Sequence, residues 1–199
     1  MSPLVESIKL KDGIVYNLAY HQDRLNRSLH ELFTKAAAID LAKELADIRL
    51  NYSGLCKVRV VYGPAVEKIE VESYTYRSVN SLKVVYHNDI DYHLKFTDRQ
   101  LLNSLYSQRE SCDDIIIVKN GLVTDAFTAN LLFFDGHQWI TPNSPLLKGT
   151  KRQLLLDTGL ITEKQVTVDA LASFHKVGLI NAMIDFDEMP IIDSKAIYF

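Results

Sequence analysis

Three short stretches of the sequence contain residues that could do chemistry. Lys95 lies in a stretch, residues 87–96, that has no clear hydrophobic period and that we expect to connect two lobes, where pockets tend to form. Asp125 follows a short hairpin strand in the run Val-Thr-Asp-Ala-Phe-Thr-Ala-Asn. Gly149-Thr150-Lys151-Arg152 opens a predicted helix, whose first backbone N–H groups could bind an anion such as phosphate.

Each of these features alone has a simpler explanation. A single lysine is usually a solvated surface charge, an aspartate after a turn is usually a turn former, and a glycine at a helix start is common. Together, a nucleophilic amine, an acid and a phosphate cradle are the components that a pyridoxal-5′-phosphate (PLP) site needs. The three stretches are therefore candidate parts of a PLP site.

Alternating strands and helices must position these residues. Residues 4–10 alternate in the manner of a strand, and Asp12-Gly13 predicts a hairpin turn before residues 14–16. Leucines at helical spacing predict a helix over about 19–37, and a shorter helix is expected over 39–48. Strands are then expected over residues 57–62, 68–76 and 82–86, the first two separated by Gly63-Pro64.

The second half of the chain predicts one helix, two hairpins and a further helix. The expected helices cover 98–108 and about 150–159, and the hairpins turn at Asn120-Gly121 and Asp135-Gly136. We therefore expect an N-terminal α+β lobe over residues 1–86, a connector over residues 87–96 that carries the cofactor lysine, and a C-terminal α+β lobe over residues 97–199.

Composition excludes several classes of partner. The 199-residue chain is 47% hydrophobic and 24% charged, and its net charge of −3 comes from interspersed charges with no basic stripe, which argues against nucleic acid. No apolar run approaches the ~20 residues of a membrane span, so no membrane partner is expected. The two cysteines, Cys56 and Cys112, predict reduced thiols in a cytoplasmic protein. The six histidines lack metal-ligand spacing, so no metal is expected.

The motifs, in this order, resemble the class IV aminotransferase family of PLP fold type IV. The matching stretches are His21-Gln-Asp-Arg24-Leu, Lys95-Phe-Thr-Asp-Arg99, Cys112-Asp-Asp-Ile-Ile-Ile-Val, Gly121–Phe133, Ile140-Thr-Pro142, Gly149-Thr-Lys-Arg152 and Asn181-Ala-Met. Within the family, Asp98-Arg99 after the lysine and Asn181-Ala182 are most similar to the 4-amino-4-deoxychorismate lyases. The resemblance implies a two-lobed α+β fold like that of D-amino-acid aminotransferase, with PLP between the lobes.

The resemblance also implies a role for each cofactor-binding residue. Lys95 would hold PLP as a Schiff base and then move the Cα proton of the substrate. Arg24 would bind the phosphate with its planar fork, and the backbone N–H groups of Thr150 and Lys151 would complete the phosphate cup. Asp125 would pair with the pyridine nitrogen and keep it protonated. The family usually has glutamate at this position, so the carboxylate here is one methylene shorter.

The substrate is less well defined by the resemblance. Arg99 would either bind a substrate carboxylate or pair with acids on its own helix. The reaction would be elimination of pyruvate from aminodeoxychorismate to give 4-aminobenzoate, or transamination of branched-chain or D-amino acids. A PLP-binding protein without catalysis is a third possibility, because relatives are expected to have an opening strand and an active-site loop before Leu4–Leu10. A homodimer is expected, since relatives complete their pockets across a dimer interface.

Overall fold

The structure is a computed structural model that describes residues 2–33 and 37–199. The chain forms two compact units, of which the first ends at Tyr76 and takes back residues 94–98, while the second contains residues 77–93 and 99–199. Lys95 therefore belongs to the first unit, although the residues on both sides of its short segment belong to the second.

The first unit is an antiparallel sheet in the order β2-β1-β3-β4. Its strands are β1 (Leu4–Lys11), β2 (Ile14–Val15), β3 (Leu55–Tyr62) and β4 (Val66–Ser73). Asp12 and Gly13 join β1 to β2 with φ angles of 49° and 79°. A type I′ hairpin turn needs positive φ at both central residues, so the predicted Asp-Gly turn is confirmed.

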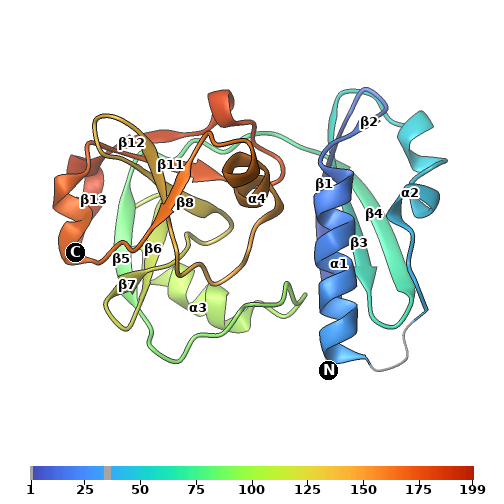
Figure 1. Cartoon of the computed structure of the whole chain (residues 1–199), viewed down its shortest axis with the longest axis horizontal. Coiled ribbons are helices and arrows are strands. Elements are labelled where there is room, and N and C mark those ends of the chain that lie inside the picture. The colour runs from blue at the N-terminus through green and yellow to red at the C-terminus, as the bar shows by residue number, and fades with distance from the viewer. Residues whose placement is uncertain (1, 34–36) are drawn as a thin grey trace. The chain divides into compact units, whose positions relative to one another are not determined.

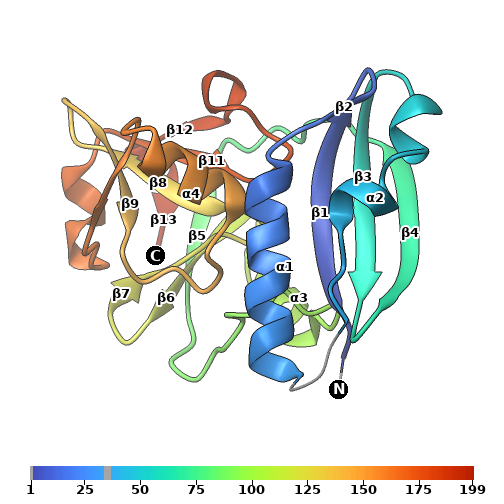
Figure 2. The same cartoon turned by 45° about the vertical axis from the view of Figure 1, so that its right-hand side comes forward.

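Two helices, α1 (Leu18–Leu32) and α2 (Leu41–Glu44), cover one face of this sheet, as Figures 1 and 2 show. Leu25 and Leu29 of α1 are buried with Ile8 of β1 and Val58 of β3 in one apolar core. The helix predicted over 19–37 ends at Leu32, because Phe33 adopts an extended backbone, and residues 34–36 of that prediction lie outside the described part of the chain.

The helix predicted over 39–48 is shorter than expected. Asp40 caps α2 by accepting hydrogen bonds from the N–H groups of Ala42 and Lys43, but the helix ends at Glu44. A 3₁₀ turn, η1 (Ile48–Leu50), follows it before β3.

The segment that carries Lys95 runs along the first part of β1. The N–H of Val5 donates to the carbonyl of Lys95 at 2.9 Å, and the N–H of Thr97 donates to the carbonyl of Pro3 at 2.8 Å. Two backbone hydrogen bonds to the sheet therefore fix the lysine's main chain within the first unit.

The second unit contains two sheets that share one core. The first sheet has the order β13-β5-β6-β7, and the second has the order β10-β9-β8-β11-β12. The first sheet is formed by β5 (Leu82–Tyr86), β6 (Asp114–Lys119), β7 (Leu122–Val123) and β13 (Ile197–Tyr198). The second is formed by β8 (Asn130–Phe134), β9 (Trp139–Pro142), β10 (Thr162–Lys164), β11 (Lys176–Ile180) and β12 (Ile191–Asp193).

The core of this unit is filled by apolar side chains from both sheets, among them Val84, Ile116, Phe133 and Val177. Two helices, α3 (Gln100–Ser107) and α4 (Thr150–Asp157), belong to the same unit (Figure 2). Its 3₁₀ turns are η2 (Asp169–Ser173), η3 (Phe186–Glu188) and η4 (Ser194–Ala196).

The boundary between the units differs from the expected division at residues 86 and 96. β5 pairs in parallel with β6, from Leu82 opposite Asp114 to Tyr86 opposite Val118, and so belongs to the second unit. The connector expected over residues 87–96 is divided between the two units after His93.

The described residues also bear on the expectations for the cysteines and for a membrane span. Cys56 and Cys112 are both buried and free, in different units. No helix among the described residues is both long and apolar enough to cross a lipid bilayer.

Candidate active site

The predicted phosphate ligand, Arg24, lies in a buried charged cluster of the first unit. Glu6 on β1 is completely buried, and its carboxylate accepts hydrogen bonds from Nε of Arg24 at 2.9 Å and from Nη2 of Arg24 at 2.5 Å. Nδ1 of His21 lies 2.6 Å from the same carboxylate. His21 and Arg24 are three residues apart on α1, so both side chains leave the helix on the face that packs against β1.

The cluster holds its charges in defined states. Burial alone would raise the pKa of Glu6, but the charge of Arg24 and hydrogen bonds from His21 and Arg24 outweigh burial and lower that pKa to about 2. Burial lowers the pKa of His21, although its hydrogen bond to Glu6 opposes the change, and the charges of Arg24 and Lys95 lower it further. A neutral imidazole that donates from Nδ1 to an ionised Glu6 agrees with both shifts.

We expect Glu6→Gln to destabilise the protein by about 3–5 kcal/mol at pH 7, because it leaves Arg24 buried without its anion. A carboxylate with a lowered pKa stabilises the folded state above its unfolded pKa and loses that contribution as pH falls. The difference between wild type and variant should therefore shrink from pH 4.5 toward pH 2. Urea denaturation at several pH values measures it.

Glu70→Gln is the matched control for this variant. Glu70 also pairs with an arginine, Arg59 at 2.9 Å, but both side chains are more than a third exposed. Solvent screens such pairs, so this control should change stability little. Equal stability of Glu6→Gln and wild type at neutral pH would contradict an essential ion pair in the cluster.

The predicted partner of the pyridine nitrogen, Asp125, is buried in the second unit with an exposed fraction of 6%. Its Oδ1 accepts a hydrogen bond from Nδ2 of Asn130 at 2.7 Å, and its Oδ2 accepts one from the N–H of Leu147 at 2.8 Å. Burial raises the pKa of Asp125 to about 6, against these two hydrogen bonds and the charge of Arg152. The described residues place no cation within hydrogen-bonding distance, so the site would favour a cationic ligand atom.

Asn130 connects Asp125 to the start of α4. Its Nδ2 also donates to the carbonyl of Leu147 at 2.9 Å, and its Oδ1 lies where a side chain at Gly149 would begin, since a Cβ there would be 2.0 Å away. Only glycine fits at this approach, which explains the residue at the helix N-cap. The structure thus gathers Asp125 and the predicted phosphate cup in one part of the second unit.

The first turn of α4 is polar and yet buried. Thr150, Lys151 and Arg152 are exposed by 4%, 5% and 3%, and the N-cap residue, Gly149, has no side chain that could cap the helix. Nζ of Lys151 pairs with Asp185 at 2.9 Å, so the side chain of Lys151 is engaged in the protein and its backbone N–H is the group that could meet a phosphate. Buried N–H groups at a helix start favour an anion.

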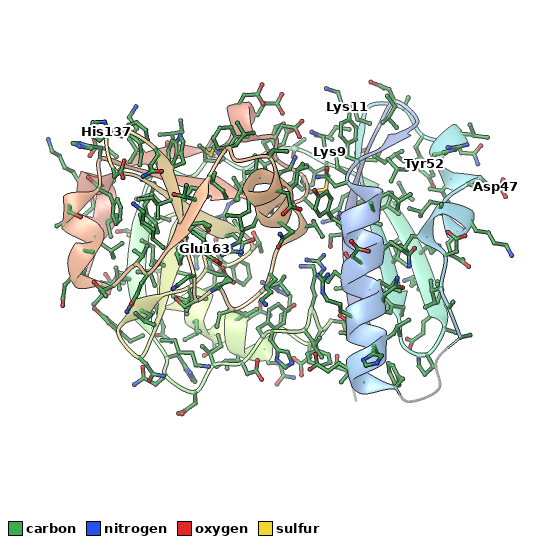
Figure 3. All side chains as sticks on the ribbon, viewed as in Figure 1. Lys9, Lys11, Asp47, Tyr52, His137 and Glu163 are labelled. Carbon is green, nitrogen blue, oxygen red and sulfur yellow. The ribbon has the colours of Figure 1, made fainter. Side chains whose placement is uncertain are left out.

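Arg152, the last of these three residues, holds α4 to the neighbouring sheet. Its Nη2 donates to the carbonyl of Pro142 on β9 at 2.9 Å and contacts Glu163 on β10, which is labelled in Figure 3. Its Nε is buried and has no hydrogen-bond partner among the described residues.

The predicted substrate residue, Arg99, makes its contacts within the second unit. Nη2 donates to the carbonyl of Phe127 at 2.7 Å, and Nη1 donates to the hydroxyl of Tyr92 at 3.3 Å. The guanidinium also lies over the rings of these two residues, 4.7 Å from Phe127 and 5.5 Å from Tyr92. No acidic side chain of its own helix pairs with it among these contacts.

Each unit therefore contains one group of predicted residues. Lys95 and Arg24 belong to the first, and Asp125, Thr150, Lys151 and Arg99 belong to the second. The sequence did not indicate a role for Glu6 or Asn130. Glu6 has a visible signal, because it is the only charged residue on the Leu4, Ile8 and Leu10 face of β1, and a charge in phase with a core face needs a buried partner. Asn130 has none in the sequence beyond the family motif.

The profile of the family described as "Amino-transferase class IV" matches residues 3–187 of the chain. The chain belongs to the class IV aminotransferase family. Enzymes of this family depend on PLP, and the two-unit α+β architecture is theirs. The predicted fold class is therefore confirmed.

Individual relatives agree with this assignment. A protein of Haemophilus somnus, provisionally named a 4-amino-4-deoxychorismate lyase, has a crystal structure with a TM-score of 0.87 and 37% identity, over 92% of this chain and 97% of that one. D-alanine aminotransferase of Bacillus licheniformis is 26% identical over 228 residues, which are 96% of this chain and 79% of the relative.

A third relative was solved with the cofactor. A hypothetical aminotransferase of Mycobacterium tuberculosis in its PLP-bound form has a TM-score of 0.76 and 15% identity, over 96% of this chain and 80% of that one. At this identity the likeness establishes the fold alone.

Proposed function

We propose that this class IV aminotransferase family member is a PLP-dependent lyase that acts on an aminodeoxychorismate-like substrate. The observation that carries the proposal is the environment of Asp125. Its carboxyl is buried, no cation among the described residues contacts it, and Asn130 ties it to the buried helix start at Gly149, an N-cap residue without a side chain. An acid for a pyridinium and N–H groups for a phosphate are the two ends of PLP, so the residues present fit the cofactor.

The roles of the residues follow from their chemistry. Lys95 would bind PLP covalently, Arg24 and the N–H groups of Thr150 and Lys151 would hold the phosphate, and Asp125 would keep the pyridine nitrogen protonated. When bound, PLP supplies an electron sink for the bond that breaks at the substrate's Cα. The neutral amine of Lys95 would accept the proton that leaves Cα, and Glu6 would hold the guanidinium of Arg24 in a fixed plane.

The lyase is favoured over the aminotransferase by two observations. The Haemophilus somnus relative with the lyase name is 37% identical, whereas the D-alanine aminotransferase is 26% identical. Asp98-Arg99 and Asn181-Ala182 also resemble the lyase branch. Transamination of branched-chain or D-amino acids is the second candidate, and a PLP-binding protein without catalysis is the third.

A substrate screen on the PLP-loaded protein separates these functions. Aminodeoxychorismate should release pyruvate and 4-aminobenzoate in equal amounts. Keto acid formation from D-alanine or branched-chain amino acids, without 4-aminobenzoate from aminodeoxychorismate, would instead establish the aminotransferase. Bound PLP with no product from any of them would support loss of catalysis.

Arg24→Ala should weaken PLP binding about 10- to 100-fold, because a hydrogen bond to a charged group contributes about 1.5–3 kcal/mol. Arg24→Lys should recover only part of the affinity, since an ammonium lacks the planar fork. Fluorescence titration of the cofactor-free proteins measures the three affinities. Equal values would show that Arg24 only neutralises Glu6.

We further propose a cytoplasmic homodimer. The two buried, free cysteines are compatible with a reducing compartment. Light scattering at micromolar concentration should give twice the 22.6 kDa of the chain. A monomer would remove the dimer from the proposal and favour the non-catalytic alternative, because the partner would no longer complete a pocket.

A further inference from the structure

Arg99 contacts the turn that carries Asp125. After Asp125 the chain turns through residues 126–129 and returns to pair Asn130 with Asp125, and the N–H of Ala126 donates to the carbonyl of Ala129 at 2.9 Å. Arg99 binds the carbonyl of Phe127, at the tip of this turn, at 2.7 Å. The turn that carries the Asp125 carboxylate is therefore held at its tip by a hydrogen bond from Arg99.

Further contacts hold Phe127, the residue that Arg99 binds, in place. The Phe127 ring stacks on the Tyr106 ring, with centroids 4.1 Å apart and planes inclined by 15°. Arg109 lies against the same Tyr106 ring, 4.2 Å from its centroid, but its hydrogen bond goes to the carbonyl of Tyr106 and not to Phe127. The N–H of Phe127 also donates to the buried carboxylate of Asp114 at 3.2 Å. Ring stacking and two main-chain hydrogen bonds thus fix Phe127.

Arg99 is also the residue at which the chain re-enters the second unit after Lys95. The segment of residues 94–98 lies on β1 of the first unit, and Arg99 begins the part that returns. Tyr92, which receives the second hydrogen bond of Arg99, lies just before the same segment on the other side. The hydrogen bond between Arg99 and Tyr92 therefore joins the residues that flank the lysine segment on its two sides.

We propose that Arg99 is a positioning residue that fixes the Asp125 turn and the two ends of the lysine segment, and that it does not bind the substrate carboxylate. Both terminal amino groups of the guanidinium already have acceptors, and two aromatic rings lie beside it. A bidentate carboxylate would have to share the terminal nitrogens with these two acceptors and fit beside the two rings. The inference rests on the proposed function, because it concerns the placement of Lys95 and Asp125 toward PLP.

The test uses Arg99→Gln and Arg99→Lys in the PLP-loaded protein. We expect Arg99→Gln to change the visible circular dichroism of the bound cofactor and the pH midpoint of its absorbance. Deuterium exchange at Cα of alanine, of either configuration, should slow about 100-fold, as for a misplaced reacting group. The alanine concentration that gives half-maximal exchange should change less than about threefold, well below the tenfold or more expected from a lost carboxylate ligand. Arg99→Lys should restore part of the signal through one hydrogen bond to Phe127.

Arg109→Gln is the matched control, since it removes an arginine from the same stack but leaves the Phe127 carbonyl bound. It should leave the circular dichroism and the exchange rate unchanged. The proposal would be overturned if Arg99→Gln left the cofactor spectrum unchanged but raised the alanine concentration for half-maximal exchange tenfold. Arg99 would then be a substrate ligand. Wild-type behaviour of both Arg99 variants would overturn it as well.

Two further measurements keep the outcomes separate. Thermal melting identifies a variant that does not fold, and Arg99→Lys, which keeps the charge and one donor, then carries the test. If wild-type protein takes up no PLP at Lys95, the proposed function fails at the control stage, before any variant is compared.

Discussion

Replacing Lys95 with alanine should abolish the covalent link to PLP and lower any turnover by at least about 10²–10⁴-fold, the contribution of a positioned base. Lys95 is the predicted lysine whose main chain is fixed by hydrogen bonds to β1, at 2.9 Å from Val5. Such anchoring fixes the region that the amine of Lys95 can reach. A lysine elsewhere in the chain would not present its amine at the same place, so we expect no other lysine to replace Lys95. Alanine in its place leaves the phosphate ligands intact, and residual, reversible binding of PLP is expected.

Borohydride reduction followed by peptide mass mapping measures this outcome. The wild-type protein should carry a pyridoxyl group on the peptide that contains Lys95, and Lys95→Ala should carry none. Lys11→Ala is the control, because Lys11 is an exposed lysine on β1, the strand to which the Lys95 segment is hydrogen-bonded (Figure 3). A pyridoxyl group on a different lysine of the wild type would remove Lys95 from the site.

Asp125→Asn should have opposite effects on stability and on chemistry. In the cofactor-free protein the pKa of Asp125 is raised from 3.8 to about 6 by burial. An acid with a raised pKa stabilises the folded state fully below its unfolded pKa and loses that contribution as pH rises through the folded value. Ionised Asp125 thus costs about 3 kcal/mol at neutral pH, at 1.36 kcal/mol per pKa unit. Asparagine removes the charge, although Leu147 can then lose its acceptor.

We therefore expect cofactor-free Asp125→Asn to be at least as stable as wild type at pH 8, and this advantage to disappear between pH 6 and pH 4. Denaturant titrations across this range provide the measurement. A variant that is less stable than wild type by the same amount at every pH would show that the carboxyl acts only as a hydrogen-bond acceptor for Leu147 and Asn130.

With PLP bound, the same substitution should slow Cα exchange by about 100-fold or more, since it removes a preorganised charge from the reacting centre. PLP should remain bound, because the phosphate and lysine contacts are unchanged. Asp125→Glu restores the family's residue and should be tolerated, with some loss of rate from crowding against Asn130 and Leu147. Unchanged exchange in Asp125→Asn would exclude Asp125 from the mechanism.

Local signals in the sequence were sufficient for most of the elements that position the site. Asp12-Gly13 and Asn120-Gly121 both adopt positive φ at both residues, as their hairpins require, and α4 begins at the predicted Thr150. These features depend on neighbours in the chain, so composition and spacing predict them.

Elements that depend on distant partners were harder to predict. β11 lies between β8 and β12 in the five-stranded sheet, yet no strand was predicted there, and its short run Lys-Val-Gly-Leu-Ile contains Gly178. Tertiary packing crowds this position, since a Cβ at Gly178 would lie 2.7 Å from the sulfur of Met189 and that side chain would have to shift. Parallel pairing of β5 with β6 is equally invisible in local sequence, and for that reason the expected lobe boundary fell after β5.

The same division applies to the site. The family motifs name Lys95, Arg24 and Asp125, but they give no information on what holds each of them. The bidentate contact of Glu6 with Arg24 and the position of Asn130 against Gly149 arise only when strand and helix, or turn and helix start, are brought together. Arg99 is the converse case, because the motif names it and the positioning role that we propose for it rests on its contacts.

The return of residues 94–98 to the first unit has a consequence for dissecting the protein. A recombinant fragment that stops at Tyr76 would keep Arg24 but lack Lys95, and the outer edge of β1 near Pro3 and Val5 would lose its hydrogen-bonding partner. An unpaired edge strand invites self-association. A single proteolytic cut therefore cannot release either unit whole, because the chain crosses between the two units three times.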